Sequence, residues 1–374
     1  MVYLDNAATS FPKPEEVYEA MDKANRELSV NAGRGSYKLA KKANGLIEET
    51  RDLLKKLVRA EANSDIIFCP SITIALNQII RGINWNKGDI VYVSPYEHNA
   101  VARTLNDISY IKLVELPIDE ETLEIDISKT KYMFAKEKPK ALFCTHISNV
   151  TGYILPVVEL FDIAKQYNAI TVLDTAQSLG VIEVDLRKIK IDFLAFAGHK
   201  SLCGPFGIGG FINVTNYPLE IVLTGGTGSD SLNLGMPAEG SSKYEPSSFN
   251  IVAFAGLNAA IKCLKINEHY SQELELTRYA VEKMKALKKV KCFVPRDHHI
   301  GIVSFVIEGY KSDEIGMILD EDYDIAVRTG YHCAPFIHKY LKDSKYLGTV
   351  RVGFGRFTTK EEIDYLVNAI KELV

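Results

Sequence analysis

Three features of this sequence could do chemistry together: a carboxylate, a lysine and a pair of hydroxyl residues, each following an apolar run. Asp174 ends the run AITVLD, and Lys200 ends IDFLAFAGHK. A carboxylate at a buried strand end needs a cationic or hydrogen-bonding partner, because burying an unpaired charge is costly. Ser71 and Thr73, in SITIALNQI, follow a third run and open a helix whose free N–H groups can hold a phosphate. Each feature alone has an ordinary structural interpretation, such as a helix N-cap.

Taken together, these residues match what pyridoxal phosphate requires of a protein. The phosphate would sit on the helix N-terminus, and Asp174 would keep the pyridine nitrogen protonated so that the ring acts as an electron sink. Lys200 would form the Schiff base. His98, which follows another apolar run, could stack on the ring. The sequence therefore predicts pyridoxal 5'-phosphate as the cofactor.

The loop RTGYHCAP (328–335) adds a cysteine whose role the residues alone leave open. Cys333 lies beside His332, with His338 five residues further on, and could be a zinc ligand, half of a disulfide, a buried small hydrophobe or a nucleophile. Zinc is disfavoured because H-C-x4-H lacks a second ligand pair, so no metal site is predicted. A buried structural cysteine is the strongest alternative. The neighbouring glycine and proline indicate an exposed loop, where Arg328 and His332 would favour the thiolate.

The composition excludes several classes of protein. A net charge of −4 over 374 residues, without a clustered basic face, gives no reason to expect a nucleic-acid partner. No apolar run approaches the roughly 18 residues of a membrane span, and the first residues show no signal peptide. The six cysteines are scattered without a CxxC, which fits a reducing cytosol, so we expect a cytoplasmic protein.

Short apolar runs alternate with amphipathic stretches from about residue 15 to 255. A helix is predicted over 36–59, and strands are predicted at 65–68, 89–94, 141–146, 169–174 and 191–198. Near-continuous apolar strands separated by helices indicate a mostly parallel sheet covered on both faces, with ligands bound beyond the carboxyl ends of the strands. Five polar groups are therefore expected to converge on one crevice: Ser71–Thr73, Glu97–Asn99, Asn149, Asp174–Gln177 and His199–Lys200.

The pattern changes after about residue 255. A long helical pattern at 252–286 is followed by short apolar runs at 300–306 and 348–354, and the chain ends in an amphipathic helix, KEEIDYLVNAIKEL. This mixture predicts a smaller α+β domain that carries the RTGYHCAP loop.

The length also favours two units, because 374 residues are too many for one ordinary core. We predict a large domain over 15–255 and a small carboxyl-terminal domain over 256–374. The first segment, 1–14, is expected to pack with the small domain.

Three motifs resemble the signatures of the class V aminotransferase family: LDTAQSLG (173–180), AGHKSLCGPFGIGG (197–210) and RTGYHCAP. Within that family they are similar to the cysteine desulfurase and selenocysteine lyase branch with a short cysteine loop. The similarity runs from YLDNAAT (3–9) to GTVRVGFGRFTTKEEID (348–364). The resemblance implies the fold type I of pyridoxal-phosphate-dependent transferases, with a mostly parallel central sheet, and a homodimer with active sites near the interface.

The resemblance also implies roles for single residues around the cofactor ring. Lys200 matches the Schiff-base lysine, and Asp174 matches the partner of the pyridine nitrogen. Gln177 would hydrogen-bond the cofactor's phenolate oxygen, and His98 would stack on its ring.

The implied phosphate contacts depart from the family pattern. Thr73 and His199 would bind the phosphate, but Ile72 stands where the family often has threonine, and Ala197 where it often has serine. Two hydroxyls are therefore missing, and the phosphate contacts, including those at Ile72 and Thr73, depend more on backbone N–H groups and on His199. Ser248, in YEPSSFN, would reach the phosphate of the partner subunit in place of the usual threonine.

The activity implied by the resemblance is that of a cysteine desulfurase. Asn149 and Arg351 would hold the carboxylate of L-cysteine, which Arg351 can grip bidentately. Lys200 would remove the Cα proton, and Cys333, on a mobile loop, would take the sulfur as a persulfide for a sulfur-acceptor protein, releasing L-alanine. Iron–sulfur cluster assembly is one process such an acceptor could serve.

Two alternatives share the fold and the cofactor. A selenocysteine lyase acting on L-selenocysteine would use Cys333 differently, because selenium can leave without forming a persulfide. A class V aminotransferase or epimerase would carry Cys333 only incidentally.

Overall fold

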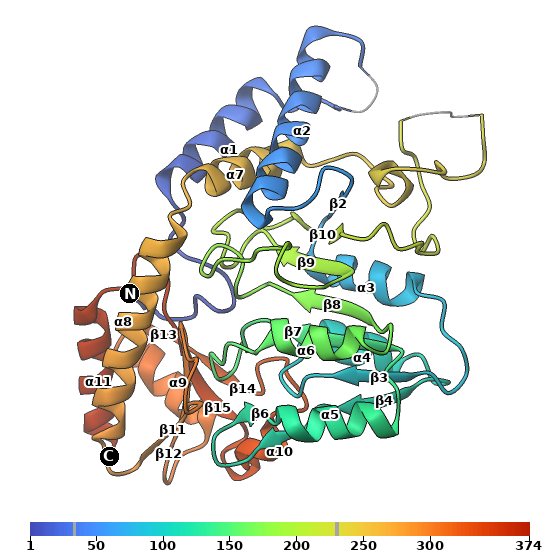
Figure 1. Cartoon of the computed structure of the whole chain (residues 1–374). Coiled ribbons are helices and arrows are strands. Elements are labelled where there is room, and N and C mark those ends of the chain that lie inside the picture. The colour runs from blue at the N-terminus through green and yellow to red at the C-terminus, as the bar shows by residue number, and fades with distance from the viewer. Residues whose placement is uncertain (33–34, 229–231) are drawn as a thin grey trace.

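The computed structural model describes residues 1–32, 35–228 and 232–374. Its central sheet has the strand order β2–β10–β9–β8–β7–β3–β4 (Figure 1). The strands are β2 (Asp65–Cys69), β3 (Ile90–Val93), β4 (Lys112–Glu115), β7 (Ala141–Thr145), β8 (Ile170–Asp174), β9 (Phe193–Ala197) and β10 (Gly209–Asn213). Neighbours from β9 to β4 pair in parallel, and β10 runs antiparallel to both of its neighbours. The predicted mostly parallel α/β sheet is confirmed.

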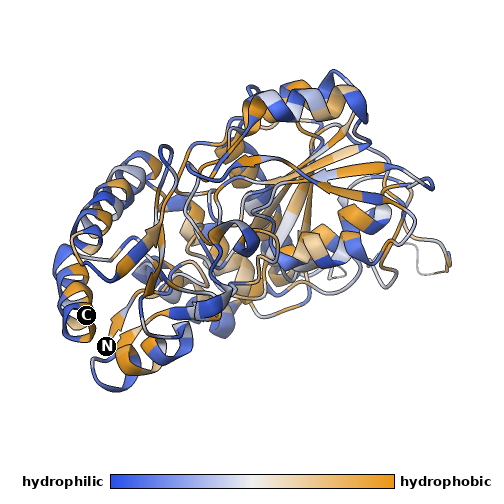
Figure 2. Ribbon diagram, turned by 90° about the horizontal axis from the view of Figure 1, so that it is seen from below, coloured by the Kyte–Doolittle hydropathy of each residue, from blue (hydrophilic) through white to orange (hydrophobic). Residues whose placement is uncertain are grey.

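Helices cover both faces of this sheet, because its strands present apolar side chains alternately to each side. In β2, Ile66 and Phe68 pack into one cluster and Ile67 and Cys69 into the other. One cluster contains α3 (Ile72–Gly82) and α4 (Asn99–Asn106). The other contains α1 (Glu15–Glu27), α2 (Lys38–Val58), α5 (Ile127–Lys136), α6 (Val157–Lys165) and α7 (Ile251–Lys262). Figure 2 shows hydrophobic residues concentrated in the strands between these helices.

A second, antiparallel sheet has the order β11–β12–β15–β14. Its strands are β11 (Val290–Phe293), β12 (Ile302–Ile307), β14 (Arg328–Gly330) and β15 (Thr349–Gly353). Its core also holds side chains of α8 (Ile266–Lys285), α9 (Ser312–Glu321) and α11 (Lys360–Leu373). On β12, Val303 and Phe305 belong to this core, whereas Ser304 Oγ donates to Val150 O, in the loop between β7 and α6 (2.6 Å). The side of this sheet away from its helices therefore meets the loop that follows β7 of the central sheet.

Both termini lie in the second unit, which is built around this four-stranded sheet (Figure 1). β1 (Val2–Tyr3) pairs in parallel with β13 (Ile325–Ala326), and Leu4 is buried in the core of that unit. The remaining elements are the hairpin of β5 (Ile118–Asp119) and β6 (Glu124–Ile125), the short helix α10 (His338–Leu341), and 3₁₀ turns at Ser241–Lys243 and Ser344–Tyr346. Among the described residues, no helix combines the length and apolar character needed to cross a membrane.

The helix predicted over 252–286 is two helices, with a break between Lys262 and Ile266. The physical reason is that its halves serve different cores: α7 packs with α1 and α2, whereas α8 packs with the second sheet. One straight helix could not fill both. The domain boundary at 255/256 itself stays a prediction.

Candidate active site

A cavity of about 220 Å³ opens where the carboxyl ends of the central strands face the second unit. The predicted site residues that line it are Ile72, Thr73, His98, Asn149, Asp174, Gln177, His199, Lys200, Cys333 and Arg351. They come from seven separate stretches of the chain. Ala7, Ala8 and Arg328 line the cavity as well, although no contact with a ligand was predicted for them.

The N-terminus of α3 forms one wall of the cavity. Ser71 is the N-cap, and its Oγ accepts from Ile74 N (3.3 Å). The N–H groups of Ile72 and Thr73 belong to the first helical turn, where backbone donors have no intrahelical acceptor. Gly209 on β10 lets this turn approach, because a Cβ there would lie 2.9 Å from Ile72 N. Together these groups form a cradle for an anion.

His199 adds a further polar group to this wall. Its Nδ1 is buried without a hydrogen-bond partner, and its ring stacks on Phe206 with the centroids 4.4 Å apart. Burial, and then the charges of Lys200 and Lys13, lower the pKa of His199 to about 4. The ring is therefore neutral, and a bound ligand could satisfy its free nitrogen.

Asp174 and Lys200 supply opposite charges to the cavity. Asp174 Oδ1 accepts from Ala176 N (2.8 Å). Burial raises the pKa of Asp174, whereas the hydrogen bond from Ala176 and the charge of Lys200 act against that rise. Burial likewise lowers the pKa of Lys200; Asp174 opposes this change, and Arg351 and Arg328 add to it. The lysine amine is therefore easier to deprotonate than one in water.

His98 presents a neutral ring. Burial first, and then the positive charge of Lys200, lower its pKa to about 4. It is the N-cap of α4, and its Nδ1 accepts from Ala100 N (3.0 Å), so the ring proton lies on Nε2. Gln177 is fixed from the amino-terminal segment, because its Nε2 donates to Ala7 O (2.7 Å).

Arg351 lies on β15, facing the cavity, and is almost fully buried. Its Nη2 donates to Asp5 Oδ1 (2.7 Å) and its Nη1 to Asn149 O (2.9 Å), while its Nε has no partner. Asp5 thus orients the guanidinium. Asp5, within YLDNAAT, is not among the site residues that the sequence predicts; its signal is a carboxylate directly after the short apolar run VYL.

The loop that carries Cys333 is held in an unusual backbone conformation. His332 and Cys333 have φ values of 46° and 56°, in the left-handed region that non-glycine residues rarely occupy. Asn99 N donates to Cys333 O and Asn149 Nδ2 donates to His332 O, both at 2.7 Å. Such conformations persist where the surroundings impose them, and they cluster at functional sites.

The expectation that His332 supplies positive charge beside Cys333 is wrong. His332 is buried, and its Nε2 lies 2.8 Å from Thr349 Oγ1. Burial first, and then the charges of Arg351, His338 and Arg328, lower its pKa well below the usual value. The ring is neutral, so Arg328 is the cation that this loop brings to the cavity.

Three observations concern the alternative roles of Cys333 as a zinc ligand and as half of a disulfide. Both ring nitrogens of His338 are hydrogen-bonded already, Nδ1 to Asp343 Oδ2 (2.5 Å) and Nε2 to Tyr331 O (3.0 Å). Across the described ranges, no group of three or more potential metal ligands gathers. All six cysteines are free thiols.

Ser248 lies outside the cavity. Its Oγ accepts from Asn31 Nδ2 (2.9 Å), and it lines a different pocket together with Arg51 and Glu245. Within one copy of the chain, Ser248 is therefore not brought to the other predicted site residues.

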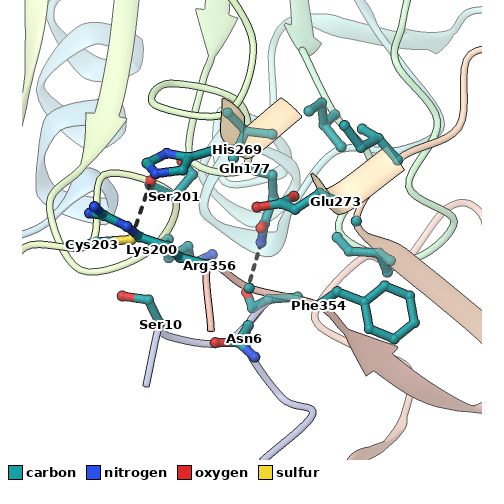
Figure 3. Close-up of a pocket in the computed structure, with 17 residues that line it drawn as sticks. Asn6, Ser10, Gln177, Lys200, Ser201, Cys203, His269, Glu273, Phe354 and Arg356 are labelled. Atoms are coloured by element: carbon teal, nitrogen blue, oxygen red, sulfur yellow. Dashed lines mark hydrogen bonds between the residues drawn. The ribbon is translucent and has the colours of Figure 1, made fainter. Parts of the chain in front are cut away.

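Next to Lys200 and Gln177 lies a smaller pocket of about 40 Å³, with Glu273 from α8 in its wall (Figure 3). This volume admits only a few water molecules. Gly301 (φ 73°) makes room for the acid, because a Cβ there would lie 2.8 Å from Glu273 Oε2. Burial raises the pKa of Glu273 to about 8, so it is mainly a neutral acid at pH 7.

Comparisons with known proteins agree on one family. The chain matches the family model described as Aminotransferase class-V over residues 2–366. It is 34% identical to a probable cysteine desulfurase of Pyrococcus abyssi and 32% identical to one of Methanothermobacter thermautotrophicus, with 100% of this chain and 94% of each relative covered. A solved apo structure of a cysteine desulfurase from Thermococcus onnurineus superposes with a TM-score of 0.91 at 32% identity, covering 100% of this chain and 94% of that one.

Proposed function

Because the chain belongs to the aminotransferase class-V family, we propose that it is a pyridoxal-phosphate-dependent cysteine desulfurase. It would convert L-cysteine to L-alanine and take the sulfur onto Cys333. The observation that carries this proposal is a single cavity lined by a partly buried lysine, a buried aspartate, an anchored arginine and a loop cysteine. The full-length relatives named as cysteine desulfurases support the same assignment.

The residues of the cavity fit pyridoxal phosphate. The first turn of α3 and the unpartnered Nδ1 of His199 suit its phosphate. The buried carboxylate of Asp174 suits a protonated pyridine nitrogen, and Lys200 Nζ would hold the cofactor covalently. His98 would stack on the ring, and Gln177 would donate to its phenolate oxygen. When bound, the cofactor supplies an electron sink for bonds at the amino acid's Cα.

The side chains around this site would each perform one task. Arg351 and Asn149 would hold the substrate carboxylate, with Asp5 keeping the guanidinium in place. Once the substrate's amine has displaced it from the cofactor, Lys200 Nζ would take the Cα proton, which its lowered pKa favours. The Cys333 thiolate would then attack the substrate's sulfur. An S–S bond forms as the C–S bond breaks, the electron pair of that bond takes up a proton at Cβ, and Lys200 returns a proton to Cα as alanine is released.

A route outward for the sulfur supports an acceptor protein as partner. A groove of about 810 Å³ lies on the outer side of the cysteine loop. Arg328, His332 and Cys333 line both this groove and the inner cavity. The cysteine therefore stands in the wall between them and could collect sulfur inside and present it outside. The six free thiols are in keeping with the cytoplasm as the compartment.

Incubation with pyridoxal phosphate and L-cysteine tests the proposed function. We expect alanine to form, and mass spectrometry of the peptide that contains Cys333 to show the added mass of one sulfur atom. Alanine without sulfur on Cys333 would refute the nucleophile assignment. If no alanine forms and other amino acids react instead, the protein is a different class V enzyme.

A second copy of the chain is proposed as the partner that completes the site. Leu232 and Leu234 are fully exposed, with relative exposures of 98% and 104%, and Leu223 is also exposed on the same segment. Exposed leucines in one segment indicate a protein contact. Ser248 follows this segment and lies outside its own cavity, so it is available to a neighbouring subunit.

We expect the double variant Leu232→Ser/Leu234→Ser to shift the protein from dimer toward monomer and to weaken cofactor binding about tenfold, as the loss of a buried contact would. Light scattering coupled to size exclusion and a cofactor titration measure the two effects. Met317→Ser, at an exposed residue of α9, is the control. An unchanged dimer in the double variant would place the interface elsewhere.

A further inference from the structure

Glu97 supports the end of β7 at the point where the neighbouring strand, β3, leaves the sheet. β3 leaves the sheet after Val93, and Ser94 N makes the last backbone hydrogen bond to β7, at Phe143 O (3.0 Å). The next residue is Pro95. β7 continues, and Thr145 N on that side donates to Glu97 Oε1 instead (2.6 Å). The glutamate side chain thus takes the place of a strand, because a buried N–H needs an acceptor.

The carboxyl group of Glu97 is fully buried and only half satisfied. Oε1 also accepts from Ser94 Oγ (2.5 Å), whereas Oε2 has no hydrogen-bond partner. In the part of the chain that the structure describes, Glu97 makes no ion pair. A buried carboxylate with one bare oxygen is costly, and a neutral acid avoids most of that cost.

The groups around Glu97 offer no compensating positive charge. Cys144 on β7 is a neutral thiol, because burial raises its pKa well above the usual value. His146, next but one on the same segment, is neutral, since burial lowers its pKa to about 4. Asp174 on β8 is a like charge. Burial raises the pKa of Glu97 to about 8; Asp174 adds to this rise, and the hydrogen bonds from Ser94 and Thr145 oppose it.

Asp174 depends on the strand that Glu97 holds. Thr145 is the register partner of Asp174, and His146 N donates to Asp174 O (2.9 Å). A displacement of the end of β7 would therefore displace Asp174, the residue to which we assign the cofactor's pyridine nitrogen.

We propose that Glu97 is a positioning residue for Asp174 that acts as a neutral carboxylic acid, holding the end of β7 without adding a second negative charge beside the cofactor. This rests on the proposed function for the role of Asp174. The positioning role of Glu97 and the neutrality of its carboxyl group can be tested separately.

Neutrality is tested on the protein without cofactor. The infrared difference spectrum between wild type and Glu97→Gln at pH 7 should contain the C=O stretch of a protonated carboxyl group and no carboxylate band. Urea unfolding gives a second reading. The pKa of Glu97 is higher in the folded state than in the unfolded state. Glu97 therefore stabilises the fold fully below its unfolded-state pKa, and this stabilisation is lost as the pH rises through about 8. Between pH 5 and 8.5 the urea midpoint of wild type should therefore fall more than that of Glu97→Gln. A carboxylate band at pH 7 overturns the proposal.

Positioning is tested on the cofactor-loaded protein. Glu97→Gln keeps the shape and the neutral charge of the side chain. The pH midpoint of the bound cofactor's absorbance should therefore stay within about 0.3 pH units of wild type, a smaller shift than the loss of a neighbouring charge would produce. Glu97→Ala leaves Thr145 N–H unpaired and should weaken cofactor binding about tenfold. Cofactor binding by Glu97→Ala equal to wild type would overturn the positioning role.

Glu273→Gln is the matched control, because Glu273 is also a buried acid with a pKa raised to about 8. It should lose a similar infrared band and flatten the pH dependence of unfolding, yet leave the cofactor absorbance midpoint unchanged. If wild type takes up no cofactor at all, the proposed function fails, while the infrared spectrum still decides whether Glu97 is neutral.

Discussion

The Cys333→Ala variant should lose the release of alanine from L-cysteine by at least about 10³-fold, the scale of removing a nucleophile. Cys333 lines the inner cavity together with Lys200 and Arg351, so its thiolate can reach a bound amino acid. The other cavity groups are untouched by the substitution. Cofactor binding, followed by visible absorbance, should therefore remain within about threefold of wild type, less than one lost hydrogen bond would cost. Alanine formation is measured with and without an added thiol acceptor.

Cys292→Ala is the control, because that thiol is partly buried on β11 and does not line the cavity. Full cysteine activity in Cys333→Ala would mean that the thiol is incidental, as in an aminotransferase or epimerase. Loss of activity toward cysteine with retained activity toward L-selenocysteine would instead favour a selenocysteine lyase.

The convergence of the strand-end residues could be predicted because it follows from local pattern. Asp174 and Lys200 each follow a run of apolar residues, and parallel strands place such ends at one edge of a sheet. The strand predicted at 169–174 is β8, at Ile170–Asp174, and the helix predicted at 36–59 is α2, at Lys38–Val58. Periodicity is sufficient where an element lies wholly within one core.

The features that the sequence did not predict depend on contacts with a distant part of the chain. β10 lies antiparallel between β9, which precedes it in the chain, and β2, which is distant in sequence, and its segment GGFIN starts with two glycines rather than a strong strand signal. His332 is neutral only because the fold buries its ring against Thr349. Glu97 was expected at the crevice with His98, but its partner Thr145 belongs to another strand. Sequence position alone does not give the burial that fixes a protonation state.

Lys200→Ala should reduce alanine formation by about 10⁴-fold or more, because it removes both the covalent attachment of the cofactor and the base for the Cα proton. The pKa of the Lys200 amine is lowered in this cavity, and an amine in the same place could act as the base. Added methylamine, which is small enough for a cavity of about 220 Å³, should therefore restore part of the activity. The yellow absorbance of the attached cofactor should be lost, and borohydride should no longer fix the cofactor to the protein. Lys87→Ala, at an exposed lysine, is the control for differences between protein preparations. Retained activity together with borohydride-fixed cofactor in Lys200→Ala would assign the attachment to another lysine. Since Lys200 is the cavity's own lysine and faces Asp174, that result would also remove the argument that this cavity is the active site.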